Sequence, residues 1–141
     1  MSGDFEAEGL KVSQLTDNVW AIDESFVRCY LVEGTERAVL LDSCMSQNSV
    51  LEGVVRRLTQ KPVDLVFSHT DPDHTRGQGG FGALLLHPAE YDYYSSKGNE
   101  GRDVRPLWEG DVLDLGGICM ETVLISGHTP GSIALLDRNR L

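Results

Sequence analysis

Four potential metal ligands lie within six residues of this chain, in the segment His69-Thr70-Asp71-Pro72-Asp73-His74. The segment directly follows an apolar run at residues 63–67, which is typical of a strand. A packed core would not tolerate two imidazoles and two carboxylates unpaired, so this density of ligands favours a metal site. A third histidine, His128, lies in a turn rich in glycine and proline between two further apolar runs. We expect these residues to converge on bound metal.

The spacing inside this segment suits metal chemistry. In an extended segment, residues two apart project to one side, so His69, Asp71 and Asp73 can face the same way while His74 takes a neighbouring position. Such a cluster divides naturally between two adjacent metal ions. A divalent cation lowers the pKa of its bound water to about 7 and produces hydroxide at neutral pH. This chemistry needs no serine or cysteine nucleophile.

Each candidate has a structural alternative. The cluster around His69 would otherwise be an acidic, solvated loop with two incidental histidines, and His128 would be an ordinary turn residue. The preceding strand and the Gly-His-Thr-Pro-Gly setting of His128 favour the metal site. His87 matches no motif, and we expect it to be structural. Aromatic residues near short helices pack more often than they line pockets, and we expect packing for Tyr91, Tyr93, Tyr94 and Trp108.

The elements that would position these residues follow from the apolar pattern. Short apolar runs separated by polar turns predict an antiparallel meander, with strands at residues 10–15, 19–22, 26–32 and 38–41. Apolar residues then recur at helical spacing over residues 50–58, with Ser49 and Glu52 as a capping box, which predicts a helix ending before Pro62.

The second half of the chain alternates strands with helices. We expect strands at residues 64–68, 83–86, 118–125 and 133–136, and a short helix at residues 88–94 that begins with proline. A meander followed by alternation predicts an α+β (mixed α/β) fold, with a mixed sheet and helices packed outside it.

Composition limits the classes of function. The chain has 141 residues, about the length of a single domain, and we treat residues 1–141 as one. Its net charge of -10 opposes a general affinity for nucleic acid or for an anionic membrane. The three cysteines, Cys29, Cys44 and Cys119, form no C-x-x-C pair, and we expect reduced thiols, with Cys29 and Cys119 in the core. No signal peptide or membrane span is evident, so we expect a cytoplasmic protein.

The motifs resemble those of the metallo-β-lactamase fold superfamily, whose pattern is H-x-H-x-D-H with a later G-H-T-P-G. The run Val-Leu-Leu-Asp-Ser at residues 39–43 also fits, and the resemblance covers nearly the whole chain in order. It implies an αβ/βα sandwich of the metallo-β-lactamase type. It also implies that Asp42 supports a ligand histidine, although Asp42 would serve nearly as well as a cap for the loop before the helix. The implied ligands are His69, Asp71 and His128 for the first metal ion, and Asp73 with His74 for the second.

Two departures from the family pattern matter. Asp71 stands where most members have a second histidine, which makes the first site harder and moves its preference from zinc towards iron or manganese, although carboxylates also bind zinc well. In having a carboxylate at this position, the chain resembles the flavodiiron branch of the family. Family members also place a bridging aspartate and a last histidine after the third histidine, whereas only 13 residues follow His128. We therefore expect a C-terminally incomplete domain.

The resemblance implies a parent protein that binds two divalent metal ions. Zinc is the expected metal, and iron or manganese is possible because of Asp71. It would be a hydrolase whose metal-bound hydroxide attacks a small-molecule thioester, lactone or phosphoester. Asp73 would orient that hydroxide, as in glyoxalase II-like hydrolases. One alternative is a non-haem di-iron oxidoreductase related to flavodiiron proteins. Another is an inactive half-domain that forms homo-oligomers through exposed sheet edges.

Overall fold

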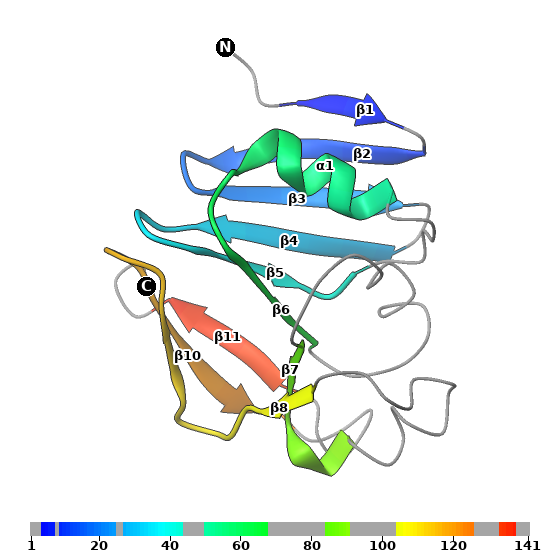
Figure 1. Cartoon of the computed structure of the whole chain (residues 1–141). Coiled ribbons are helices and arrows are strands. Elements are labelled where there is room, and N and C mark those ends of the chain that lie inside the picture. The colour runs from blue at the N-terminus through cyan, green and yellow to red at the C-terminus, as the bar shows by residue number, and fades with distance from the viewer. Residues whose placement is uncertain are drawn as a thin grey trace.

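Two β-sheets and one α-helix make up the described part of the chain (Figure 1). The structure is a computed structural model that describes residues 4–7, 9–24, 27–43, 50–67, 84–90, 104–125 and 133–137. The larger sheet has eight strands in the order β1 to β8, and the smaller has three in the order β11-β10-β9.

The first five strands form an antiparallel meander, and the sequence predicts the last four of them. They are β1 (Phe5–Ala7), β2 (Leu10–Thr16), β3 (Val19–Glu24), β4 (Val27–Glu33) and β5 (Ala38–Leu41). The helix α1 (Val50–Leu58) then returns the chain so that β6 pairs parallel to β5.

The sheet continues in parallel from β5. Its remaining strands are β6 (Val63–Val66), β7 (Leu84–Leu86) and β8 (Val104–Pro106), with the 3-10 turn η2 (Pro88–Glu90) after β7. The smaller sheet is antiparallel and consists of β9 (Val112–Asp114), β10 (Cys119–Leu124) and β11 (Ile133–Asp137).

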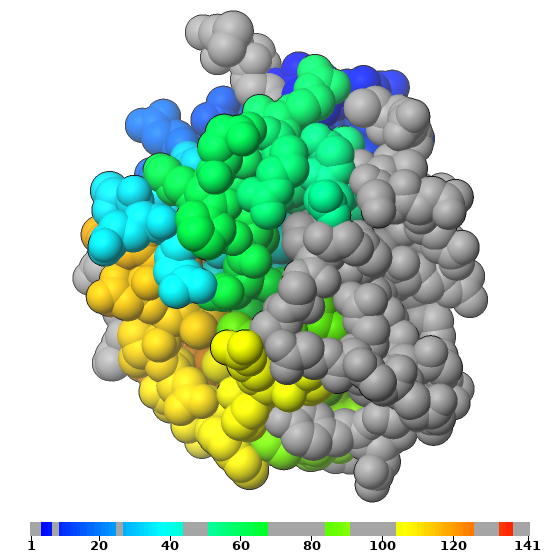
Figure 2. Space-filling model, in the orientation of Figure 1, coloured from blue at the N-terminus to red at the C-terminus, as the bar shows by residue number. Residues whose placement is uncertain are grey.

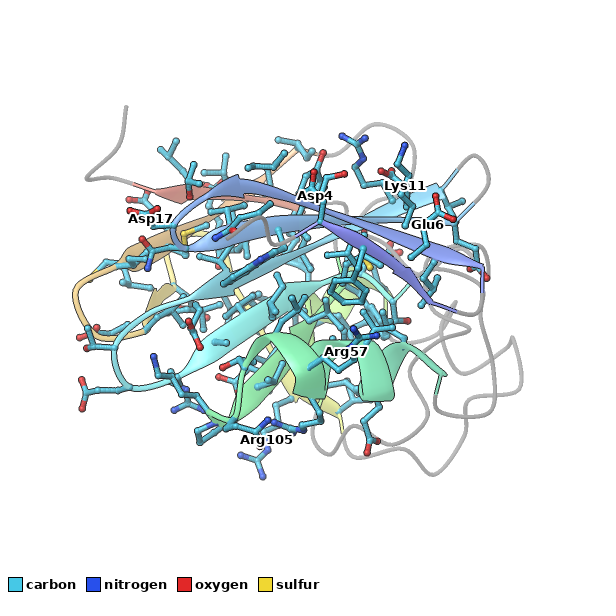
Figure 3. The ribbon with its side chains drawn as sticks, turned by 90° about the horizontal axis from the view of Figure 1, so that it is seen from above. Asp4, Glu6, Lys11, Asp17, Arg57 and Arg105 are labelled. Carbon is cyan, nitrogen blue, oxygen red and sulfur yellow. The ribbon has the colours of Figure 1, made fainter. Side chains whose placement is uncertain are left out.

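The larger sheet is covered on both faces, and its central strands alternate between two apolar clusters. Leu40 and Leu65 belong to the cluster that includes Leu51 of α1, whereas Val39 and Val66 pack with residues of the smaller sheet. Viewed from above, α1 and the smaller sheet lie on opposite sides of the larger sheet (Figure 3). Burial on both faces explains why β5 reads as an unbroken apolar run.

The helix α1 has one apolar and one charged side. Leu51, Val54 and Val55 are buried against the larger sheet, and Arg56 and Arg57 are exposed. The Arg57 guanidinium lies 4.0 Å from the centroid of the Phe5 ring, so the basic side of the helix also covers β1. Among the residues described, no helix has the length and apolar character to span a membrane.

Several sequence predictions needed correction. The strands β1, β8 and β9 were not predicted, because each has three residues and mixes polar with apolar side chains. Cys29 is fully buried, as predicted. Cys119 is only partly buried, because successive side chains along β10 face opposite sides of the sheet and its neighbour Met120 takes the buried side. The helix expected at residues 88–94 is a 3-10 turn over Pro88–Glu90, and residues 91–94, like Ser49 and Cys44, lie outside the described residues.

Candidate metal centre

The predicted ligands lie in two segments that fall outside the described residues. These ligands are His69, Asp71, Asp73, His74 and His128. Their convergence therefore stays a prediction, and the structure bears on it through the strands that lead into and out of the two segments.

The first segment leaves the carboxyl end of the parallel strands. There the Asp42 amide donates to the Val66 carbonyl at 2.7 Å, and the Phe67 amide donates to the Leu85 carbonyl at 3.0 Å. The ladder of hydrogen bonds is thus intact up to Phe67, two residues before His69. Open sheets with parallel strands hold their ligands outside this edge.

The second segment leaves the smaller sheet at the same end of the molecule. Leu124 of β10 pairs with Ile133 of β11, so residues 126–132, with His128, connect the two strands. In Figure 1, β5 and β6 run to the right, and β10 ends and β11 begins on that side. Val66, Leu124 and Ile133 also pack in one apolar cluster. Both ligand segments therefore start from a shared part of the core, which fits the predicted two-segment metal centre.

Asp42 is the candidate residue that the structure does describe. It follows β5, its exposed fraction is 6%, and its backbone has a positive φ of 66°. Aspartate is one of the few side chains that adopt this left-handed conformation readily. Residues held in such conformations cluster at functional sites. Its position beside the end of β6 fits a residue that supports a ligand histidine, and that role stays a prediction.

Two further titratable residues lie at this edge. His87, after β7, accepts a hydrogen bond at Nδ1 from the Ala89 amide (3.0 Å), as expected for a structural histidine. Glu90 in η2 is fully buried, and sequence reasoning missed it. Nothing in the sequence indicated its burial, which comes with the turn in which the Glu90 amide donates to the His87 carbonyl at 2.9 Å.

Among the residues described, no three His, Cys, Asp or Glu side chains are arranged to hold an ion. The predicted ligands around His69 and at His128 are imidazole and carboxylate groups, which suit zinc, iron or manganese.

The ion pairs among the described residues lie at the surface. Arg37 contacts Asp64 at 2.8 Å near the start of β6, away from the carboxyl edge. Arg28 has a pKa above its ordinary value, because its guanidinium donates to Asp23 and also interacts with Tyr30. Exposed pairs of this kind contribute little to stability.

Comparison with known proteins settles the family. Residues 22–140 match the sequence model of the metallo-beta-lactamase superfamily. The chain belongs to this superfamily. A subclass B3 metallo-beta-lactamase of Bradyrhizobium japonicum has the same fold, with a TM-score of 0.71 at 20% identity over 89% of this chain and 56% of that one. A mutant flavo di-iron protein of Thermotoga maritima also shares it, with a TM-score of 0.72 at 14% identity over 97% of this chain and 40% of that one.

A curated relative is also similar in sequence. The acyl-coenzyme A thioesterase MBLAC2 of Bos taurus is 25% identical over an alignment that covers 89% of this chain and 61% of the relative. This metallo-β-lactamase superfamily chain thus spans about three fifths of that relative.

Proposed function

We propose that the parent protein is a metal-dependent hydrolase that acts on a thioester or another activated carbonyl substrate. The observation that carries this proposal is the His69-x-Asp71-x-Asp73-His74 segment, which begins three residues after the parallel strand β6 in a chain of this superfamily. Among carbonyl substrates, the thioester is favoured by the name of the cow relative, an acyl-coenzyme A thioesterase. Lactones and phosphoesters are the other substrate classes to compare.

In this proposal each predicted ligand has a specific role. His69, Asp71 and His128 hold one divalent cation, and Asp73 and His74 hold a second. Such cations, when bound, supply hydroxide at neutral pH and polarise the oxygen that gains charge. Asp73 also orients the attacking nucleophile, which makes it the residue to test. The buried Asp42 supports one ligand histidine.

The test uses the full-length parent protein with a panel of thioesters and lactones. We expect hydrolysis that depends on bound metal, and we expect Asp73→Ala to lower kcat/KM by about 10³-fold, as for loss of a group that acts in proton transfer and positioning. Asp17→Ala, which changes an exposed turn between β2 and β3, is the matched control and should leave the rate unchanged. An Asp73→Ala variant as fast as the unaltered protein would remove this mechanism.

A second candidate is a non-haem di-iron oxidoreductase. It is favoured by the carboxylate of Asp71 and by the likeness of the fold to a flavo di-iron protein. Protein purified without oxygen should then contain iron in preference to zinc. Elemental analysis that finds zinc alone, together with thioester hydrolysis, would exclude it.

A further inference from the structure

Trp108 is an exposed aromatic residue at the carboxyl edge of the larger sheet. It lies two residues after β8, and its exposed fraction is 53%, whereas Trp20, the other tryptophan, is 7% exposed in the core. In Figure 2 the yellow atoms of β8 and of the residues that follow it lie at the molecular surface. The expectation that Trp108 packs is therefore only partly met, because about half of its side chain is open to solvent.

The backbone on either side of Trp108 is firmly held. The Leu107 amide donates to the Leu86 carbonyl at 3.0 Å, and the Leu107 side chain is buried. The Trp108 amide donates to Asp111 Oδ2 at 2.7 Å, and the Asp111 amide returns a bond to the Trp108 carbonyl at 3.0 Å. A ligand that binds this ring pays little to order the backbone beneath it.

The ring of Trp108 also has a partner. It meets the His87 ring edge to face, with centroids 5.3 Å apart and planes at 75°. Such an arrangement is favourable and holds both rings in place. We call these two side chains, His87 and Trp108, the aromatic pair.

Two carboxylates lie close to Trp108 in the chain, and each accepts a backbone hydrogen bond. The nearby carboxylates face backbone amides, since Glu109 Oε2 accepts from the Leu124 amide at 3.1 Å and Asp111 Oδ2 accepts from the Trp108 amide. Ile125, the residue after β10, also has an exposed fraction of 53%. The exposed Trp108 ring is the apolar surface that this part of the edge offers to a ligand.

The place of the aromatic pair in the sheet sets its distance from the end of β6. It follows β7 and β8, and β8 is two strands from β6, which leads to His69. Neighbouring strands are about 4.8 Å apart, so these strand ends lie about 10 Å from each other. A group at that distance binds a remote part of a substrate and does not touch the reacting atoms.

We propose that the aromatic pair binds the apolar acyl chain of the substrate. This inference rests on the proposed function, because it assigns the acyl end of a thioester or lactone to the β8 side of the candidate metal centre. It makes Trp108 a specificity-determining residue that favours longer acyl chains over acetyl groups.

The test measures binding without hydrolysis, with octanoate as the probe and acetate as the short-chain comparison. In a Trp20→Phe background, Trp108 is the sole tryptophan, and its fluorescence should change on adding octanoate and stay constant on adding acetate. By calorimetry, Trp108→Ala should weaken octanoate binding about tenfold, the change expected when one aromatic contact is lost. His87→Ala should weaken it less, since only the support of the ring is lost.

Leu15→Ala is the matched control, because Leu15 is an equally exposed apolar residue on β2. It should leave octanoate affinity unchanged. Equal octanoate affinity in Trp108→Ala and the unaltered protein would overturn the inference, and so would equal effects of Trp108→Ala and Leu15→Ala. Since no turnover is needed, a protein that binds octanoate through Trp108 but hydrolyses neither thioesters nor lactones would refute the proposed function and leave the binding surface intact.

Discussion

At the scale of single residues, Asp42 links the sequence motif to the fold. Its amide donates a hydrogen bond to the carbonyl of Val66 at the end of β6, its side chain is buried, and its backbone occupies the left-handed region. The sequence shows an aspartate at the end of a strand, but neither the burial nor the positive φ is visible there. The two roles considered for it, support of a ligand histidine and capping of the following loop, make different predictions.

We expect Asp42→Ala to weaken zinc binding by 10- to 100-fold, about the cost of losing a carboxylate that orients a metal ligand. Alanine also tolerates the left-handed backbone poorly, so the free energy of unfolding should fall by at least about 1 kcal/mol. Asp42→Asn tolerates this backbone better, so it should destabilise less while still weakening zinc binding. Chelator competition and urea unfolding measure the two effects. Unchanged zinc affinity in both variants would leave only the capping role.

At the scale of elements, the two sheets are joined at the end opposite the candidate metal centre. The turn between β4 and β5 packs on the turn between β9 and β10, where the Glu36 amide donates to the Leu115 carbonyl at 3.0 Å. The Thr35 amide likewise donates to the Gly116 carbonyl at 2.9 Å. Gly34 makes this contact possible, because a Cβ there would lie 2.0 Å from the Leu115 carbonyl oxygen. Backbone atoms cannot yield to such an overlap as a flexible side chain can.

We therefore expect Gly34→Ala to lower the free energy of unfolding by about 3 kcal/mol, the upper part of the usual range for overpacking. Gly53→Ala is the control, since Gly53 lies in α1 and its added Cβ meets no atom within 4 Å. That variant should instead stabilise the protein by about 0.5–1 kcal/mol, because alanine is the better helix former. Urea denaturation of both variants checks the pair. Similar effects of the two substitutions would contradict the close packing of the turns.

At the scale of the whole molecule, the sequence predicts best the elements whose own residues determine them. Ala38–Leu41 was predicted with both bounds because it is buried on two faces, and α1 was predicted from its helical apolar spacing. The strand Val104–Arg105–Pro106 was missed, since it forms only through pairing with β7, which brings distant residues together. Contacts between distant residues also limit what can be predicted of the candidate site. The two motifs are visible in the sequence, but whether their segments leave the same edge of the molecule depends on how the two sheets pack.

The central claim is that His69 and His128 bind the same cation. Its most direct test is a crystal structure of the protein crystallised with zinc, with anomalous diffraction used to locate the metal. The account predicts zinc with a nitrogen of His69 and a nitrogen of His128 each about 2.1 Å away. Side chains of these two histidines more than about 10 Å apart, or zinc bound without either of them, would contradict it, because no single ion could bridge such a gap with bonds of that length.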